Sequence, residues 1–306
     1  MPVVLDGKAV RDAILESLRP RVARLVEEQR APGLAVVLVG HNPASEIYVR
    51  SKVKACEELG IASEKHLPTG DVSTEDMLFL VNRLNQRRDI DGILVQLPLP
   101  DQVDEQEVLL AIDPSKDVDG FHPISSGNLM ANRAGFRPCT PAGVMKMLEH
   151  YGVPLAGKHA VVVGRSDIVG KPMAMLLLHA NCTVTICHSK TQNLAAECRR
   201  ADIVVAAIGR PAFITRDFVK PDAVVIDVGI NRVKERDRVV QMFGDNPARM
   251  AAFEKNGSVV VGDVHPEVFE HCAAYTPVPG GVGPLTIAML MSNTVASAEW
   301  RLGITP

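Results

Sequence analysis

The sequence predicts an α/β protein with two domains, the second of them a Rossmann-like domain with a parallel sheet. Short apolar runs and helical segments alternate along most of the chain, which is the order that parallel sheets require. Hydrophobic residues make up 46% of the chain but aromatic residues only 4%, as expected where aliphatic side chains pack helices on parallel strands. A length of 306 residues is long for one core and suits two domains.

The charge balance and the cysteine pattern narrow the class of protein. A formal net charge of −3, without a basic run, argues against nucleic-acid binding. No segment resembles a membrane span or a secretory signal, so we expect no membrane association. The six cysteines are scattered and form no C-x-x-C motif, which is typical of reduced thiols. We therefore expect a soluble cytoplasmic protein.

The first series of elements begins with the apolar run Leu34–Gly40, which predicts a buried strand. Residues Ala44–Gly60 predict a helix that ends at a glycine. A second helix follows Ser73, which forms a capping-box pattern with Asp76. The run DGILVQLPLP, residues 91–100, then predicts another apolar strand that ends in prolines.

The second series begins with a predicted helix over Thr140–Gly152, with Pro141 at its start. Helices from Lys171 and from about Thr191 separate the strands that follow, and this order predicts right-handed parallel crossovers. The four predicted strands cover residues 159–164, 183–189, 202–209 and 223–229. A last helix, Pro284–Leu302, follows the completed series, and we expect it to pack on the first domain.

These elements predict a discontinuous first domain. We expect it to comprise residues 1–120 plus 283–306, and the second domain to comprise residues 140–275. The connecting segments are then residues 121–139 and 276–282. The polar stretch Lys234–Asn256 lies within the second domain, and we expect a surface excursion there.

The turn in VVVGRSDIVGKPMA, residues 161–174, predicts a nucleotide-binding site. Gly164 ends a strand and Gly170 begins a helix, so free backbone N–H groups and the helix dipole point at one place. The glycines match neither the G-x-G-x-x-G fingerprint nor a phosphate-binding loop, since Pro172 follows Lys171 where a hydroxyl would hold magnesium. An ordinary strand-to-helix turn is the alternative.

The end of the next strand favours NADP over NAD. NAD-binding units place a carboxylate there to bond the ribose hydroxyls. This strand is instead followed by His188, Ser189, Lys190 and Thr191, and the turn's own Arg165 supplies a further cation. This composition suits a 2′-phosphate, although a solvated basic loop would have the same composition.

A zinc site in the same region is disfavoured. His179, Cys182, Cys187 and His188 are all acceptable zinc ligands. The two cysteines flank a short predicted strand, however, and the strand would have to fold into a knuckle to bring them together. We interpret both thiols as packing residues and expect no metal.

Tyr48 and Lys52 are candidate catalytic residues, because a spacing of four puts them on one helical face. A lysine in a partly buried cleft is poised for proton transfer, since burial disfavours its charged form. An interfacial tyrosine beside a snorkelling lysine is the alternative. Short-chain dehydrogenases share this pair, but there it follows the cofactor fingerprint, whereas here it precedes the turn by more than a hundred residues.

Gln96 and two aspartates add polar groups to the same region. Gln96 interrupts an apolar strand near its carboxyl end, where a buried amide needs a partner such as the lysine or a ligand. Asp117 and Asp119 follow at the domain junction, where a carboxylate could bond a ring N–H and an amino group together. A turn-forming aspartate before Gly120 is an equally good interpretation.

The loop TPVPGGVGPLT, residues 276–286, precedes the last helix. Three glycines and three prolines make it tight and rigid, which suits a preorganised wall against a flat ligand. A plain linker seldom has this composition.

Taken together, these motifs resemble the bifunctional methylenetetrahydrofolate dehydrogenase/methenyltetrahydrofolate cyclohydrolase family. The resemblance rests on YVRSKVKACEELGI, DGILVQLPLP, DVDGFHP, PCTPAG, VVGRSDIVGKP, CHSKT, VIDVGIN, GDV and TPVPGGVGPLT, in this order from about residue 39 to residue 295. It implies two α/β domains around a cleft, the second binding NADP, in a homodimer. It also implies a role in one-carbon metabolism and purine biosynthesis.

The resemblance implies two reactions on tetrahydrofolate derivatives. NADP+ accepts a hydride from 5,10-methylenetetrahydrofolate, and water then opens the methenyl cation to 10-formyltetrahydrofolate. A dehydrogenase of the same family without the hydrolase activity is the alternative, and a nucleotide-binding protein without chemistry is a third interpretation.

The resemblance also implies roles for individual residues. Lys52 matches the catalytic lysine, Gln96 the amide that positions it, and Asp119 the aspartate that holds the pterin. The implied catalytic residues are Lys52, Tyr48, Gln96 and Asp119, and the implied substrate-binding residues are Tyr48, Val95, Gln96, Leu97, Asp119, Pro279, Gly280 and Gly281. The implied cofactor-binding residues are Gly164, Arg165, Ser166, Ile168, Ser189, Thr191, Gly209 and Ile230. The excursion 234–256 is longer than the family usually has at this place.

Overall fold

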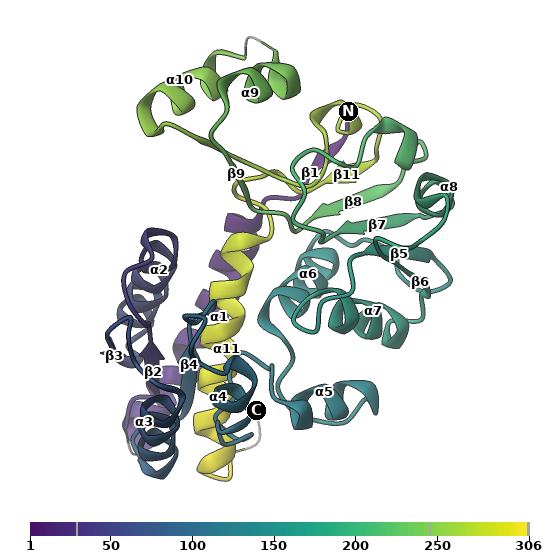
Figure 1. The fold of residues 1–306 in the computed structure, drawn as a ribbon. Helices are drawn as coiled ribbons and strands as arrows, with labels where there is room; N and C mark the ends of the chain where they lie inside the picture. The colour runs from purple at the N-terminus through teal and green to yellow at the C-terminus, as the bar shows by residue number, and fades with distance from the viewer. Residues whose placement is uncertain (29, 245, 305–306) are drawn as a thin grey trace. The chain divides into compact units, whose positions relative to one another are not determined.

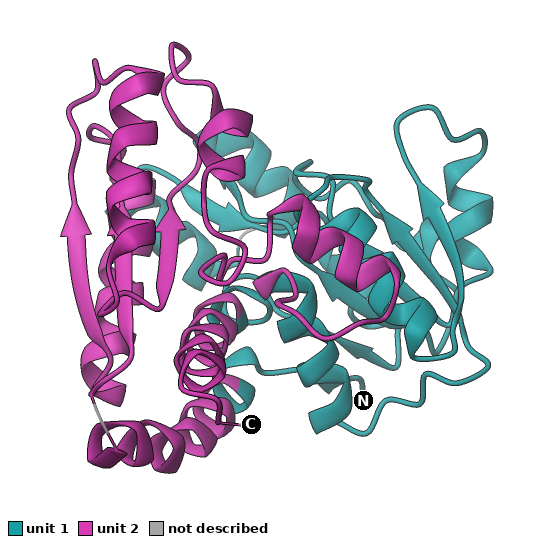
Figure 2. Cartoon of the chain, turned by 90° about the horizontal axis from the view of Figure 1, so that it is seen from below, with its two compact units in different colours: residues 1–10, 140–285 teal, residues 11–139, 286–306 magenta. Residues whose placement is uncertain are grey.

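A computed structural model of the chain describes residues 1–28, 30–244 and 246–304 (Figure 1). The chain divides into two compact units, which Figure 2 distinguishes by colour. Unit 1 comprises residues 1–10 and 140–285, and unit 2 comprises residues 11–139 and 286–306. Helices α1 (Gly7–Glu28) and α11 (Gly283–Arg301) each begin in unit 1 and continue into unit 2.

Unit 1 contains a six-stranded sheet in the order β1-β11-β8-β7-β5-β6, and every pair of neighbouring strands is parallel (Figure 1). The prediction of a parallel sheet is therefore confirmed. The strands are β1 (Val3–Val4), β5 (His159–Val163), β6 (Thr183–Cys187), β7 (Ile203–Ala206), β8 (Val224–Asp227) and β11 (Ala274–Tyr275). The helices are α6 (Cys139–His150), α7 (Gly170–His179) and α8 (Leu194–Arg199), with short 3-10 helices at Arg216–Phe218 and Pro266–Val268.

The first ten residues differ from the expected domain boundaries. We expected residues 1–120 in one domain, but residues 1–10 belong to unit 1. The reason is that β1 pairs with β11 at the edge of the large sheet, where Val3 N donates to Ala273 O at 2.8 Å and Leu5 N to Tyr275 O at 2.8 Å. Two residues are too short a strand to show a period in the sequence.

The excursion within unit 1 is folded. Strands β9 (Asn231–Val233) and β10 (Val259–Val261) pair antiparallel, apart from the large sheet. Between them lie helices α9 (Arg236–Phe243) and α10 (Pro247–Asn256). The described residues of this segment have a small core of their own, formed by Val233, Val239, Met242, Val259 and Val261.

Unit 2 has a three-stranded parallel sheet in the order β3-β2-β4, with a hydrophobic core on each face. Alternate residues of the strands face opposite cores, so Leu34, Val36 and Leu94 pack with α2 and α11, whereas Ile93 and Val95 pack with α3. The elements are β2 (Gly33–Val37), α2 (Pro43–Leu59), β3 (Ala62–His66), α3 (Thr74–Gln86), β4 (Gly92–Val95), α4 (Glu105–Leu110) and α5 (Pro123–Met130), together with most of α1 and α11.

Two polar side chains bind the two ends of helix α3 in unit 2. Ser73 caps α3 in a reciprocal box with Asp76, as predicted. Lys116 is buried and donates to three carbonyls at the other end of α3, those of Leu84, Asn85 and Arg87, at 2.6–2.9 Å. Burial lowers the pKa of Lys116 to about 8.

None of the described helices has the length and apolar character needed to span a membrane.

Candidate active site

Lys52 is a buried lysine of α2 whose ammonium has a defined partner. Its side chain is 6% exposed, and Nζ donates to Oε1 of Gln96 at 3.0 Å. A buried ammonium is costly unless it is hydrogen-bonded, so this contact fixes the position of the side chain. Of the two partners expected for the Gln96 amide, a lysine or a ligand, the structure shows the lysine.

Gln96 faces α2 because of the alternation along β4. Strand β4 ends at Val95, one residue earlier than a strand interrupted by Gln96 would require. Gln96 N nevertheless donates to Val37 O at 2.9 Å, which continues the ladder and keeps the side chain on the face of Leu94. Its Nε2 donates to Leu97 O at 2.8 Å, which orients Oε1 toward Lys52.

Asp119 is a carboxyl group that interacts electrostatically with Lys52. Burial raises the pKa of Asp119, and the ammonium of Lys52 and a hydrogen bond with Cys139 oppose that increase. A carboxyl that is desolvated beside an ammonium is available to bind a polar ligand. Lys52, Gln96 and Asp119 therefore form one polar cluster within unit 2, which we call the Lys52 cluster.

Asp117 has a different role. Its carboxylate accepts from Phe121 N at 3.1 Å, from His122 N at 2.8 Å and from Ser125 Oγ at 2.8 Å. Burial raises its pKa to about 6. The turn-forming interpretation therefore applies to Asp117. No backbone amide donates to the carboxylate of Asp119 among the described hydrogen bonds.

The other implied substrate residues of unit 2 lie around the same strand end. Tyr48 lies one turn before Lys52 on α2 and is 37% exposed. Leu97 follows Gln96 directly and is partly exposed. Val95 is only 3% exposed, and its side chain packs in the core on the α3 face. Its side chain is therefore not available to a ligand on the α2 face.

The glycine turn of unit 1 follows β5. Gly164 has φ +134°, and a side chain there would collide with the carbonyl oxygen of Ala207, which follows the neighbouring strand β7. A side chain at Gly170 would likewise collide with the carbonyl oxygen of Gly164. Both positions therefore require glycine for this close approach of the backbone. Strands β5 and β7 are neighbours although β6 lies between them in sequence, which is the switch point where such sheets bind ligands.

Ser166 takes the place of the missing middle glycine. Its Oγ accepts from Val169 N at 3.2 Å and from Gly170 N at 3.3 Å, and its carbonyl accepts from Lys171 N at 3.1 Å. The side chain of Lys171 forms an ion pair with Asp167. The start of α7 is thus held by the turn itself, and Lys171 is engaged locally rather than as a phosphate-loop lysine.

The other implied cofactor residues follow neighbouring strands of the same sheet. Ser189 and Thr191 follow β6, Gly209 follows β7, and Ile230 follows β8. Thr191 Oγ1 accepts from His188 N at 2.8 Å and closes the turn that exposes Ser189. Because all these strands are parallel, their carboxyl ends lie at one edge of the sheet.

Three exposed side chains at this edge suit a dinucleotide. Arg165 is exposed and makes no hydrogen bond or ion pair with any described residue. Ile168 and Ile230 are 38% and 52% exposed, which is unusual for large apolar side chains near a sheet. A free guanidinium fits a phosphate, and apolar side chains fit the faces of flat rings.

Two buried aspartates hold the loops at this edge, and neither is among the site residues predicted from the sequence. Asp263 accepts from the amides of Ile208, Gly209 and Arg210 at 2.7–3.0 Å and from Asn231 Nδ2 at 2.8 Å. Asp227 accepts from the amides of residues 229, 263 and 264 at 2.9 Å. Burial raises the pKa of Asp227 to about 7. The sequence signal was an aspartate within two residues of a glycine at two strand ends, in VIDVG and GDV.

The loop 276–282 lies after β11, next to β8 in the same sheet. Gly281 N donates to Pro277 O at 2.8 Å within the loop, and Gly7 N donates to Gly280 O at 3.0 Å. Gly280 has φ +108°. Pro279 and Gly280 remain partly or fully exposed at this loop, whereas Gly281 is buried.

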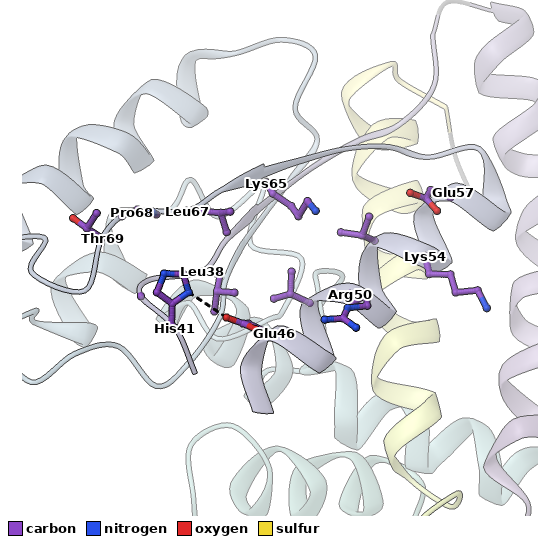
Figure 3. Close-up of a pocket in the computed structure, with 13 residues that line it drawn as sticks. Leu38, His41, Glu46, Arg50, Lys54, Glu57, Lys65, Leu67, Pro68 and Thr69 are labelled. Atoms are coloured by element: carbon purple, nitrogen blue, oxygen red, sulfur yellow. Dashed lines mark hydrogen bonds and ion pairs between the residues drawn. The ribbon is translucent and has the colours of Figure 1, made fainter. Parts of the chain in front are cut away.

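A cavity of about 550 Å³ lies in unit 2 on another face of α2 (Figure 3). It is lined by residues of α2, by the loop after β2 and by the end of β3, among them Arg50, Lys54, Lys65 and Leu67. None of the predicted site residues lines it, and the side chain of Lys52 reaches Gln96 instead.

No group of three or more His, Cys, Asp or Glu side chains that could hold a metal is found among the described residues. Cys182 Sγ donates to Leu155 O at 3.1 Å, and Cys187 is fully buried in the core of unit 1.

Comparison with known proteins identifies two matching family models. The catalytic domain of tetrahydrofolate dehydrogenase/cyclohydrolase matches residues 5–119, and the NAD(P)-binding domain of the same name matches residues 138–302. The bifunctional protein FolD of Solibacter usitatus is 61% identical over 305 residues, which cover 99% of this chain and 100% of the relative.

Two solved structures extend the comparison. The bifunctional FolD methylenetetrahydrofolate dehydrogenase/cyclohydrolase from Campylobacter jejuni is 44% identical, with a TM-score of 0.89 over 98% of this chain and 100% of that chain. The FolD of Trypanosoma brucei, complexed with NADP cofactor and an inhibitor, is 37% identical, with a TM-score of 0.87 over 98% of each chain.

Proposed function

Since the chain belongs to the tetrahydrofolate dehydrogenase/cyclohydrolase family, we propose that its Lys52 cluster binds and converts the folate substrate. The chain is a bifunctional enzyme. It oxidises 5,10-methylenetetrahydrofolate to the methenyl compound with NADP+, and it hydrolyses that compound to 10-formyltetrahydrofolate. The observation that carries the proposed site is the 3.0 Å hydrogen bond between buried Lys52 and Gln96, beside Asp119.

In the proposed site Asp119 holds the pterin. A carboxyl has two oxygens, which can pair with a ring N–H and the neighbouring amino group at once. Its raised pKa results from burial, so binding a polar edge restores interactions that water would otherwise supply. Tyr48, one turn before Lys52, presents a partly exposed ring to the same ligand.

Lys52 serves the hydrolysis. Water adds to the methenyl carbon, the bond from that carbon to one ring nitrogen breaks, and protons pass from the water to the freed nitrogen and to solvent. Gln96 holds Nζ at a fixed position while the lysine exchanges a proton with the attacking water.

The residues at the sheet edge of unit 1 fit NADP. Gly164 and Gly170 let the backbone of the turn pack closely on Ala207 and on itself, and the start of α7 that follows this turn would offer its backbone N–H groups to a phosphate. Arg165 and Ser189 would hold the 2′-phosphate, and Ser166, Ile168, Thr191, Gly209 and Ile230 would line the rest of the cofactor. Bound NADP+ supplies the hydride acceptor.

We also propose that the enzyme is a cytoplasmic homodimer whose formyl product supports purine biosynthesis. All six cysteines are free and buried, which suits a reducing compartment. Light scattering tests the dimer, with an expected mass of twice the 33.0 kDa chain. A mass of one chain at micromolar concentration would contradict it.

The proposed site is tested by ligand affinity. Asp119→Asn should raise the KM for methylenetetrahydrofolate on the order of tenfold, because one acceptor oxygen is lost, and should leave the KM for NADP+ unchanged. Asp117→Asn is the contrasting variant, since its carboxylate serves the local turn. It should lower the melting temperature more than it changes KM. The opposite assignment of these two effects would refute the proposed role of Asp119.

A further inference from the structure

Helix α10 of the excursion carries one arginine that reaches outside the excursion. Arg249 lies in the first turn of α10, whose start is capped by Asn246, with Oδ1 accepting from Arg249 N at 3.2 Å. Its guanidinium lies over the ring of Phe243 from α9, 4.7 Å from the ring centre. The side chain is thus fixed at its base by a helix cap and at its end by an aromatic face.

The guanidinium of Arg249 bridges two backbone segments. Nη1 donates to Val260 O of β10 at 3.0 Å, and Nη2 donates to Val278 O at 2.8 Å. The first bond joins α10 to β10, the strand that follows it. The second bond joins the excursion to the loop 276–282, which is far from it in sequence and carries the implied substrate residues Pro279, Gly280 and Gly281.

Three carbonyl attachments hold the loop 276–282 before Val282, whose own carbonyl accepts from Leu285 N, and each of the three has a different kind of partner. Pro277 O accepts from Gly281 within the loop, and Gly280 O accepts from Gly7 at the start of α1. Val278 O accepts from Arg249, the one charged side chain that bonds to this loop among the described residues. A charged donor bonds more strongly than an amide, so Arg249 fixes the loop between its other two attachments.

We propose that Arg249 is a positioning residue, which makes the excursion 234–256 a brace that sets the shape of the loop 276–282 for the folate substrate. The proposal rests on the proposed function and on the substrate-binding role that the family resemblance implies for Pro279, Gly280 and Gly281. The loop needs an attachment at Val278 because Gly280, at φ +108°, follows Pro279 and glycine has many alternative conformations. Holding Val278 O selects one of them before the substrate binds, which lowers the ordering cost of binding.

The test compares three variants of the full-length enzyme. Arg249→Met keeps the aliphatic stem and removes both hydrogen bonds, and Arg249→Lys keeps the charge and can satisfy one carbonyl. Arg232→Met is the matched control, because Arg232 belongs to β9 and donates to Ser258 Oγ at 3.2 Å without contacting the loop. All three are measured by steady-state kinetics and by hydrogen exchange of the amides of Val278, Gly280, Gly281 and Val282.

Arg249→Met should raise the KM for methylenetetrahydrofolate about five- to tenfold, with changes under twofold in kcat and in the KM for NADP+. The amides of Gly280 and Gly281 should exchange faster by a similar factor. Arg249→Lys should recover part of both effects, and Arg232→Met should show neither.

Two results would overturn the proposal in different ways. Unchanged exchange in Arg249→Met, or equal effects from Arg232→Met, would show that Arg249 does not hold the loop. Faster exchange with an unchanged folate KM would show that the loop is held by Arg249 but does not serve the folate site, so the premise fails. Activity of the wild-type enzyme in the same assay separates both results from a failure of the proposed function.

Discussion

Replacing Gln96 by leucine tests whether the amide positions Lys52. The variant keeps most of the side-chain volume but removes the acceptor Oε1, which lies 3.0 Å from Nζ. A hydrogen bond to a charged group contributes about 1.5–3 kcal/mol, which corresponds to a factor of about 10 to 150 in rate. Gln96 is partly exposed and Asp119 also faces the ammonium, so we expect the lower end, about tenfold.

The assay measures both activities of Gln96→Leu in one preparation. Loss of methenyltetrahydrofolate reports the hydrolysis, and reduced NADP reports the oxidation. We expect kcat for hydrolysis to fall about tenfold, because Lys52 must keep its position while it exchanges a proton. Gln102→Leu is the control, since the amide of Gln102 donates to Gly70 O and Val72 O instead. Wild-type hydrolysis by Gln96→Leu would refute the positioning role.

Three further predictions concern the cofactor and the stability of each unit. Arg165→Ala should raise the KM for NADP+ on the order of tenfold but leave the KM for NAD+ unchanged in initial-rate assays, because only NADP+ carries a 2′-phosphate, and equal changes would contradict this role. Asp263→Ala should lower the free energy of unfolding in urea by about 3–5 kcal/mol, since four donors lose their acceptor; a loss below about 1 kcal/mol would contradict it. Lys116→Met should cost about 2–4 kcal/mol by the same measurement, because three carbonyls lose their donor. The folded-state pKa of Lys116 is lowered from 10.5 to about 8, so the unfolded chain binds the proton more tightly. The stability of the wild type relative to Lys116→Met should therefore rise with pH between about 8 and 10.5, and no such rise would contradict the cause given for the shift.

The parallel sheet of unit 1 was predictable because its central strands are long apolar runs that end at glycines. Strands β5, β7 and β8 are buried on both faces, so their sequences contain almost nothing but aliphatic residues. Strands β1 and β11 have two residues each, and the edge strand β1 is defined by its pairing with β11, which joins residues more than 260 positions apart. No local pattern records such a partner.

The polar residues also divide into those that a local pattern indicates and those that depend on a distant partner. A contact between Lys52 and Gln96 could be expected from the sequence, because a partly buried lysine on a helix and an amide at the end of an apolar strand each require a polar partner. Asp263 was not recognised, because its role depends on backbone amides from another strand end. Arg249 was hidden for a similar reason. It lies in a polar segment without periodicity, and its partner Val278 O belongs to a distant loop.

A comparison of Lys52→Met with Lys54→Met tests the central claim most directly. Both lysines belong to α2, but Lys52 is buried against Gln96, whereas Lys54 is exposed and pairs with Glu58. With 5,10-methylenetetrahydrofolate and NADP+ supplied, we expect Lys52→Met to lose at least a hundredfold in formation of 10-formyltetrahydrofolate, the usual contribution of a positioned acid–base group. Lys54→Met should remain within twofold of the wild type. Formation of 10-formyltetrahydrofolate at similar rates by both variants would contradict the assignment of Lys52 as the catalytic lysine.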